Sequence, residues 1–126
     1  MRFWDHIRQG DWVTFERARL WAVALLIAYA IAIAGLFLTA HGLNDYQDRP
    51  LGSDFSNIYT AGIQANAGHA ADIYVPPKHL AAERAIFGAK TPFYGWHYPP
   101  FLLLLATPLA RLPYLAALFV WQALTF

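Results

Sequence analysis

The longest uncharged stretch of this sequence covers residues 20–40, where 21 consecutive positions (LWAVALLIAYAIAIAGLFLTA) carry no Asp, Glu, Lys or Arg. At about 1.5 Å of rise per residue, a helix of that length crosses a hydrocarbon core of about 30 Å. The core helix of a soluble protein seldom runs this far without a polar stripe, and the apolar region of a signal peptide spans only about 7 to 15 residues. We therefore expect residues 20–40 to form a transmembrane helix.

The composition narrows the class of protein. Charged residues make up 13% of the chain, whereas a typical soluble domain has about a quarter, so an ordinary soluble enzyme is disfavoured. The nine Lys and Arg residues are scattered and the net charge is +1, which argues against nucleic acid as a partner. Because there is no cysteine, any chemistry must come from carboxylates, histidines, hydroxyls or a bound cofactor.

Basic residues flank the predicted transmembrane helix closely on one side only. Arg17 and Arg19 come immediately before it, whereas the first basic residue after it is Arg49. Basic flanks stay on the cytoplasmic side of a membrane. We therefore expect residues 1–19 to be a cytoplasmic segment and residues 41–98 to be an extracytoplasmic loop.

The apolar sequence returns in residues 99–126, interrupted by Arg111, Leu112 and Pro113. Two interpretations compete: one long helix kinked by prolines, or a short second span that descends to a cytoplasmic turn at Arg111 before a third span starts. We favour the second, because proline disfavours helix at the residue before it and Arg111 then lies on the cytoplasmic side. The apolar run reaches Phe126 without a polar tail, which suggests a truncated multi-pass protein of the cell (inner) membrane.

Two helices are predicted within residues 41–98, both lying along the membrane surface. Apolar residues recur at helical spacing in the first, namely Phe55, Ile58, Tyr59, Gly62 and Ile63. Gly68 is placed to end this helix. The second, weaker helix runs from Pro77 to Gly88, and both would roof the membrane-embedded part.

Asp54 stands at the start of the first of these helices, and the residues leave two roles open for it. Asp is favoured as an N-cap residue, where its carboxylate accepts a backbone hydrogen bond. Alternatively, its carboxylate is a general base, kept ionised by the helix N-terminus at the outer membrane interface. The residues alone favour the cap, because caps are common and catalytic acids are rare.

Histidines are the other candidates for chemistry. His97 precedes Tyr98 and two prolines, and its ring could donate a hydrogen bond to a phosphate at the interface, although an interfacial histidine more often bonds water or backbone. His69 and His79 lie too far apart in the sequence to indicate a metal pair. A loop carboxylate without nearby partners also disfavours a bound cation, so we expect no metal site.

Three blocks of sequence, in this order, resemble the opening of glycosyltransferase family 87, a family of integral membrane enzymes. They are SDFSNIYTAG (residues 53–62), AGHAADIY (67–74) and YGWHYPPFLLLLATPLARLP (94–113). An Asp-Phe pair opens an aromatic, Ala-rich helix in the first block, and Tyr-Pro-Pro leads into a Leu-rich span in the third. Together with the first transmembrane helix, the resemblance covers residues 20–122.

The resemblance implies an all-α integral membrane protein, the N-terminal portion of a multi-span type C glycosyltransferase fold. Such enzymes resemble polyprenyl-phosphate-mannose-dependent mannosyltransferases. They transfer a hexose, with mannose as the first candidate, from a polyprenyl-phosphate sugar donor to a hydroxyl of a glycolipid or glycan acceptor. The transfer takes place at the outer membrane face, inverts the anomeric carbon and needs no cofactor beyond the lipid-linked donor.

The same resemblance implies roles for individual residues. Asp54 would be the general base that takes the proton of the acceptor hydroxyl. Tyr98 would shape the donor groove, His97 would contact the donor phosphate, and Tyr59 would border the acceptor site. All four are expectations from the likeness of the sequence blocks.

The alternative belongs to another class of protein: a non-catalytic small membrane protein or accessory subunit whose loop binds a protein or lipid partner. The chain has 126 residues, whereas the enzymes of the family are several times longer, so it is expected to be too short to act alone. A natural stop codon after Phe126, together with stable accumulation of the short chain, would favour this alternative.

Overall fold

The computed structural model describes residues 4, 10 and 13–125, and the chain divides into two compact units, Met1–Leu38 and Thr39–Phe126. Within the described residues every regular element is a helix, and the only β pairing consists of isolated bridges between residues 41 and 50. The all-α class predicted from the sequence is therefore confirmed. About half of the predicted cytoplasmic segment 1–19 lies outside the described residues.

The first unit contains α2 (Phe15–Leu38), a helix near the N-terminus that is long and apolar enough to cross a membrane. At about 1.5 Å per residue its 24 residues exceed a hydrocarbon core of about 30 Å. The helix begins before the predicted position 20 because Thr14 caps it: the Thr14 hydroxyl accepts a hydrogen bond from the Arg17 backbone N–H at 3.3 Å. None of its residues is buried, and most of its large apolar side chains are exposed.

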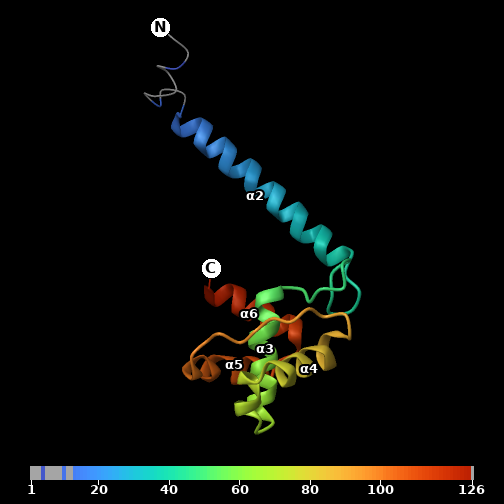
Figure 1. The fold of residues 1–126 in the computed structure, drawn as a ribbon. Helices are drawn as coiled ribbons and strands as arrows, with labels where there is room; N and C mark the ends of the chain where they lie inside the picture. Colours follow the sequence, from blue (N-terminus) through green and yellow to red (C-terminus); the bar gives the residue numbers. More distant parts are fainter. Residues whose placement is uncertain (1–3, 5–9, 11–12, 126) are drawn as a thin grey trace. The chain divides into compact units, whose positions relative to one another are not determined.

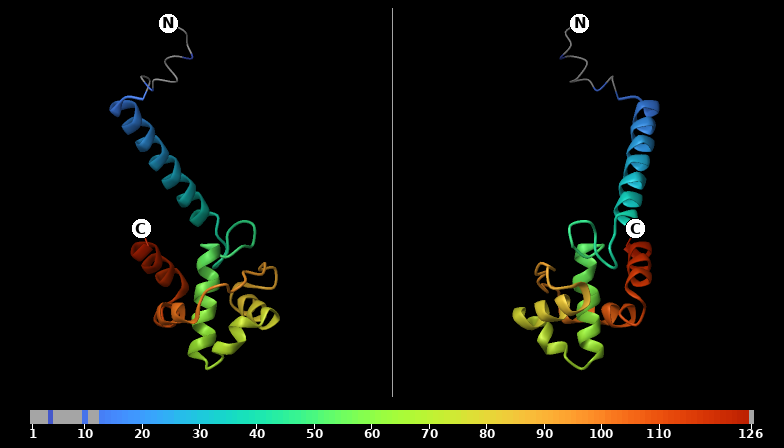
Figure 2. Two further views of the ribbon diagram at one scale, coloured as in Figure 1. Left: turned by 60° about the vertical axis from the view of Figure 1, so that its left-hand side comes forward. Right: turned by 90° about the vertical axis from the view of Figure 1, so that its right-hand side faces the viewer.

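The second unit is built around α3 (Ser53–Asn66), which runs through its middle (Figure 1). α4 (Pro76–Phe87) and α5 (Leu103–Leu109) cross it on opposite sides, as Figures 1 and 2 both show. α6 (Tyr114–Thr125) packs against the first turn of α3. A short 3-10 helix, Ala70–Tyr74, links α3 to α4.

The structure corrects the prediction of an amphipathic surface helix around residues 55–63. The predicted apolar face exists, and Phe55, Ile58 and Tyr59 are buried on it. However, nine of the 14 residues of α3 are buried, because its polar face is covered as well: Asn57 and Gln64 contact His79 of α4. The end of the helix is as predicted, since Gly68 follows it with a positive φ of 83°.

α3 and α5 cross at a point where only small residues fit. A Cβ atom added at Gly62 would lie 2.7 Å from the Ala106 carbonyl carbon and 2.7 Å from the Ala110 Cβ. Ala106 is completely buried. Because glycine has no Cβ, the two helix backbones can approach this closely.

The predicted break inside residues 99–126 is confirmed. α5 ends at Leu109, residues 110–113 form a turn, and α6 begins directly after Pro113. The apolar helical segment Pro100–Leu109, which includes the 3-10 helix Pro100–Leu102, covers roughly 15 Å, about half of a hydrocarbon core. α6 is also short, at 12 residues, so the second and third spans stay predictions. The Tyr59 hydroxyl of α3 donates to the Leu112 carbonyl in the turn, so α3 and this turn cannot lie on opposite sides of a membrane as predicted.

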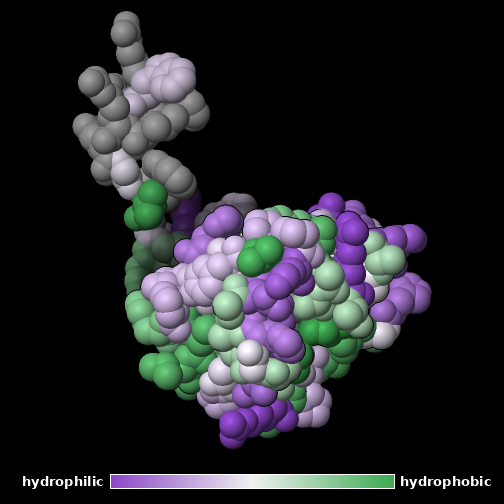
Figure 3. Space-filling view, turned by 60° about the horizontal axis from the view of Figure 1, so that its bottom comes forward, coloured by the Kyte–Doolittle hydropathy of each residue, from purple (hydrophilic) through white to green (hydrophobic). Residues whose placement is uncertain are grey.

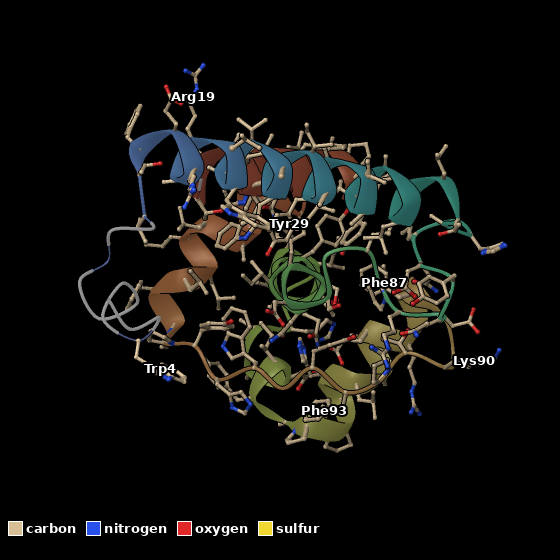
Figure 4. All side chains as sticks on the ribbon, turned by 90° about the horizontal axis from the view of Figure 1, so that it is seen from above. Trp4, Arg19, Tyr29, Phe87, Lys90 and Phe93 are labelled. Atoms are coloured by element: carbon tan, nitrogen blue, oxygen red, sulfur yellow. The ribbon has the colours of Figure 1, made fainter. Side chains whose placement is uncertain are left out.

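α4 and the segment 88–99 each have one buried side and one exposed side. α4 begins at Pro76 and ends at Phe87, close to the predicted range 77–88. Phe87 is buried with its ring centroid 4.8 Å from that of Tyr114, whereas Lys90 and Phe93 are exposed (Figure 4). Hydrophilic and hydrophobic side chains are intermixed on the face shown in Figure 3.

Candidate functional site

Asp54 lies in the first turn of α3 with an exposed side chain. The N-cap role that the residues favoured for it is wrong, because Gly52 occupies the N-cap position and no side chain caps the helix there. Gly52 can do this because its φ of 68° turns the chain into the helix, and its carbonyl accepts the Phe55 N–H at 2.8 Å. The Asp54 carboxylate is therefore not committed to capping.

Asp54 lines a pocket of about 310 Å³ between the start of α3 and the last turns of α6. The start of α3 contributes Gly52, Ser53, Asp54 and Phe55, and α6 contributes Trp121 and Gln122. Pockets that bind small molecules are typically about 300–1,000 Å³, so this one is at the small end of that range.

Aromatic packing fixes the wall that faces Asp54. The Trp121 ring stacks on Phe55, with centroids 5.8 Å apart and planes inclined by 30°. Phe55 is 2% exposed and also contacts the Tyr114 ring at 5.7 Å. The Tyr114 hydroxyl in turn donates to the Leu51 carbonyl, just before α3. These contacts hold α6 against the beginning of α3 and so define the pocket.

The pocket brings together three kinds of chemistry. The Asp54 carboxylate accepts hydrogen bonds and, as a base, protons. The Gln122 amide both donates and accepts hydrogen bonds, and the Trp121 indole offers a flat apolar surface. Among the described residues that line the pocket, Asp54 carries the only charge.

Tyr59, predicted to border an acceptor site, is buried in the same aromatic cluster and does not line the pocket. Its ring lies 6.1 Å from Phe55 and 5.1 Å from Tyr114. Its hydroxyl donates to the Leu112 carbonyl at 2.8 Å and so holds the turn between α5 and α6. Burial raises the pKa of the Tyr59 hydroxyl above its usual value, which keeps it protonated as a donor.

His97 and Tyr98 are exposed on the segment 88–99 and also lie outside the Asp54 pocket. The Tyr98 ring meets Trp96 edge to face at 5.1 Å, and its carbonyl accepts a hydrogen bond from the Tyr74 hydroxyl at 3.4 Å. His97 packs against Gly95, where an added Cβ would lie 2.8 Å from His97 Nε2. His97 and Tyr98 are thus neighbours in space, and their roles in binding stay predictions.

A buried polar cluster joins α3 to α4. His79 and Glu83 on α4 are completely buried. His79 Nδ1 lies 2.6 Å from Gln64 Oε1, and His79 Nε2 lies 2.7 Å from Asn57 Oδ1. Glu83 Oε1 lies 3.7 Å from His79 Nε2. Since Gln64 and Asn57 are on the polar face of α3, this cluster fixes how α4 sits on α3.

The same cluster holds the segment that carries His97 and Tyr98. Asn57 Nδ2 donates to the Gly95 carbonyl at 3.0 Å, and Glu83 Oε2 accepts the Tyr94 backbone N–H at 3.2 Å. Because the Asn57 nitrogen faces Gly95, its oxygen faces His79 and accepts a hydrogen bond from the Nε2–H of the ring. The cluster is enclosed by protein, so it positions elements and does not contact a substrate.

Burial also sets the charges within the cluster. Removal from water lowers the pKa of His79 to about 4 and raises the pKa of Glu83 to about 7, and the Tyr94 N–H opposes the shift of Glu83. The lowered pKa favours the neutral form of His79, whose single N–H is then on Nε2, facing Asn57 Oδ1. Within the described residues, Glu83 Oε1 has no hydrogen-bond partner, which adds to the preference for the protonated carboxyl that burial creates below about pH 7.

The histidines do not gather around a metal position in the part of the chain that the structure describes. His69 lies 3.6 Å from Asp72 in an exposed ion pair, whereas His79 is buried in the cluster with Glu83. In those residues no group of three or more His, Asp or Glu side chains could hold a metal ion.

Sequence reasoning missed both pocket residues from α6. Trp121 and Gln122 fall within the apolar run 114–126, which was interpreted only as a span. The available signal was Gln122, an amide in an otherwise mostly apolar segment. The pairing of His79 with Glu83 was also available, because residues four apart lie on one face of a helix.

Comparisons with known proteins give no relatives for this chain. No protein-family model, no curated protein and no solved structure matches it. The function is therefore argued from the three sequence blocks and from the geometry of the pocket.

Proposed function

We propose that this chain belongs to a membrane glycosyltransferase in which Asp54 is the general base. The enzyme transfers a hexose, with mannose as the first candidate, from a polyprenyl-phosphate sugar to an acceptor hydroxyl. One observation carries the proposal: the exposed Asp54 carboxylate, uncommitted to capping, lines a pocket of about 310 Å³ with an indole and an amide. A base in an open pocket has room for the hydroxyl that it would deprotonate.

The proposed reaction is a direct displacement. The Asp54 carboxylate takes the proton of the acceptor hydroxyl as the acceptor oxygen forms a bond to the anomeric carbon of the donor. The bond between that carbon and the phosphate oxygen breaks, and its electron pair leaves with the polyprenyl phosphate. The anomeric configuration inverts. Phosphate is a good leaving group, so one positioned base and hydrogen-bond donors to the phosphate suffice.

The membrane supplies the donor in this proposal. A polyprenyl chain resides in lipid, and α2 is long and apolar enough to keep the protein there. Arg17 and Arg19 at the start of α2 favour a cytoplasmic N-terminus in the cell (inner) membrane. The Asp54 loop is then on the outer face, where a glycolipid or glycan acceptor would be met.

The remaining predicted residues have distinct parts in the proposal. His97 would donate to the donor phosphate and Tyr98 would shape the donor groove, and both side chains are exposed enough to do so. Tyr59 would act from behind the acceptor site by supporting Phe55, whose ring it contacts at 6.1 Å.

The test of the function is a transfer assay. Membranes containing the protein, expressed from its complete coding frame, are supplied with polyprenyl-phosphate carrying tritiated mannose and with a glycolipid extract as acceptor. We expect label to enter the acceptor with inverted anomeric configuration, at a rate that rises with the amount of protein. Transfer no faster than in membranes that lack the protein would overturn the proposal for mannose. The same assay with glucose and arabinose donors applies the test to other sugars.

A further inference from the structure

We propose that the pocket beside Asp54 binds the pyranose ring of a sugar acceptor, with Trp121 as its stacking surface and Gln122 as a hydrogen-bonding residue. This inference rests on the proposed function, because it takes Asp54 to face the acceptor. It adds the place where the sugar ring of the acceptor binds and assigns α6 a part in binding it. Neither Trp121 nor Gln122 is among the site residues predicted from the three sequence blocks.

The Trp121 ring is suited to stacking because it is held in place before any ligand arrives. Phe55 stacks on it at 5.8 Å, and Phe55 is itself 2% exposed within the aromatic cluster. Trp121 is only half-buried, so part of the indole remains open to the pocket. A pyranose ring has an apolar face of C–H groups, and a rigid indole can cover such a face at little cost in conformational entropy.

The rim of the pocket matches sugar hydroxyls. Gln122 is exposed, and its amide can donate to one hydroxyl and accept from another. The Ser53 hydroxyl also lines the pocket and can do the same. The ionised Asp54 carboxylate only accepts hydrogen bonds. Gln122, Ser53 and Asp54 together therefore offer both donors and acceptors to the hydroxyl groups of a sugar.

The charge of the pocket distinguishes the acceptor from the donor. Its described lining contains the Asp54 carboxylate and no Lys, Arg or His. A phosphate placed there would be repelled by that carboxylate and would find no cation to bind it. A neutral polyhydroxyl ring has no such conflict. The volume of about 310 Å³ also suits one sugar ring.

Binding is measured without donor, so that it does not depend on catalysis. Purified protein from the complete coding frame, in lipid nanodiscs, is titrated with methyl α-mannopyranoside by saturation-transfer NMR, and inorganic phosphate is added as competitor. We expect binding of the pyranoside that phosphate does not displace. Trp121→Ala should weaken this binding by about tenfold, whereas Trp121→Phe, which keeps a flat ring, should weaken it less.

The remaining variants separate the pocket from the rest of α6. Gln122→Ala should weaken binding several-fold, and Leu124→Ala, an exposed position on α6 that does not line the pocket, should leave it unchanged. No pyranoside binding by the wild type, equal binding by Trp121→Ala, or displacement by phosphate would overturn the inference. Pyranoside binding that depends on Trp121 in a protein that transfers no sugar would support the pocket and refute the proposed function.

Discussion

Phe55 on α3 stacks on Trp121 on α6, with ring centroids 5.8 Å apart. Phe55 follows Asp54 directly, so one helical turn presents the carboxylate and supports the opposite wall of the pocket. The packing of α6 against α3 and the proposed chemistry are therefore linked through adjacent residues. A change in either helix should affect both the stability of the second unit and the pocket.

Phe55→Leu tests this link. Leucine keeps an apolar side chain but removes the ring contacts, so we expect a loss of about 0.5–1.5 kcal/mol in the free energy of unfolding beyond that from lost buried area. Pyranoside binding should weaken as well, because Trp121 loses its support. The matched control is Phe93→Leu at a position that is 45% exposed, which should change neither quantity. Similar effects of both substitutions would contradict the role given to Phe55.

Gly62→Ala tests the close crossing of α3 and α5. The added methyl group would lie 2.7 Å from the Ala110 Cβ and against the Ala106 backbone, so the helices must separate. We expect a destabilisation of about 1–3 kcal/mol, measured by denaturant unfolding of the purified protein. Gly35→Ala on α2 is the control, because an added Cβ there meets nothing within 4 Å. An unchanged unfolding midpoint for Gly62→Ala would show that the helices do not cross as described.

Glu83 should make stability depend on pH. Its pKa is about 7 in the folded protein and ordinarily 4.5, so between these values the folded state retains a proton that the unfolded state has released. Its contribution to stability therefore falls as the pH rises from about 4.5 to about 7. Glu83→Gln removes this pH dependence. We expect the free energy of unfolding of the variant, measured relative to that of the wild type, to be a few kcal/mol higher at about pH 8 than at about pH 4.

His79 should make the free energy of unfolding change with pH in the opposite direction. Its pKa is about 4 in the folded protein and ordinarily 6.5, so stability is lost as the pH falls between these values. In the Glu83→Gln protein this slope should appear alone, measured as urea unfolding at several pH values. If the free energy of unfolding depended on pH in the same way in the wild type and in Glu83→Gln, burial would not raise the pKa of Glu83 as described.

The absence of cysteine allows the topology to be measured cleanly. We expect Lys90→Cys, at an exposed position of the second unit, to react in intact cells with a maleimide that cannot cross the inner membrane. Glu16→Cys, at the start of α2, should react only after the membrane is permeabilised. The reverse pattern would place the Asp54 loop in the cytoplasm and remove the basis for an outer-face enzyme.

Local pattern predicted much of the fold. The uncharged run predicted α2, the apolar spacing around Phe55 predicted α3, and the prolines before Tyr114 predicted the break that the structure contains. These signals succeed because spacing and backbone restriction act within a few residues.

The burial of the polar face of α3 was not predictable in the same way. Asn57 and Gln64 are polar residues on the face of α3 opposite its apolar side, and distant partners explain their burial. Both pair with His79, 22 and 15 residues away, and Asn57 also donates to the Gly95 carbonyl. The pocket was missed for a similar reason, because Trp121 reaches Asp54 only through the folding back of α6. Contacts between distant segments leave little trace in local periodicity.

The most direct measurement of the central claim is the initial rate of mannose transfer by Asp54→Asn beside that of Asp48→Asn. Asp48 is an exposed loop carboxylate paired with Lys90 at 2.7 Å, and asparagine tolerates its φ of 61°. We predict that Asp54→Asn loses about 10²–10⁴-fold in rate, as expected for a general base, while Asp48→Asn stays near wild type. A near-normal rate for Asp54→Asn would contradict the account.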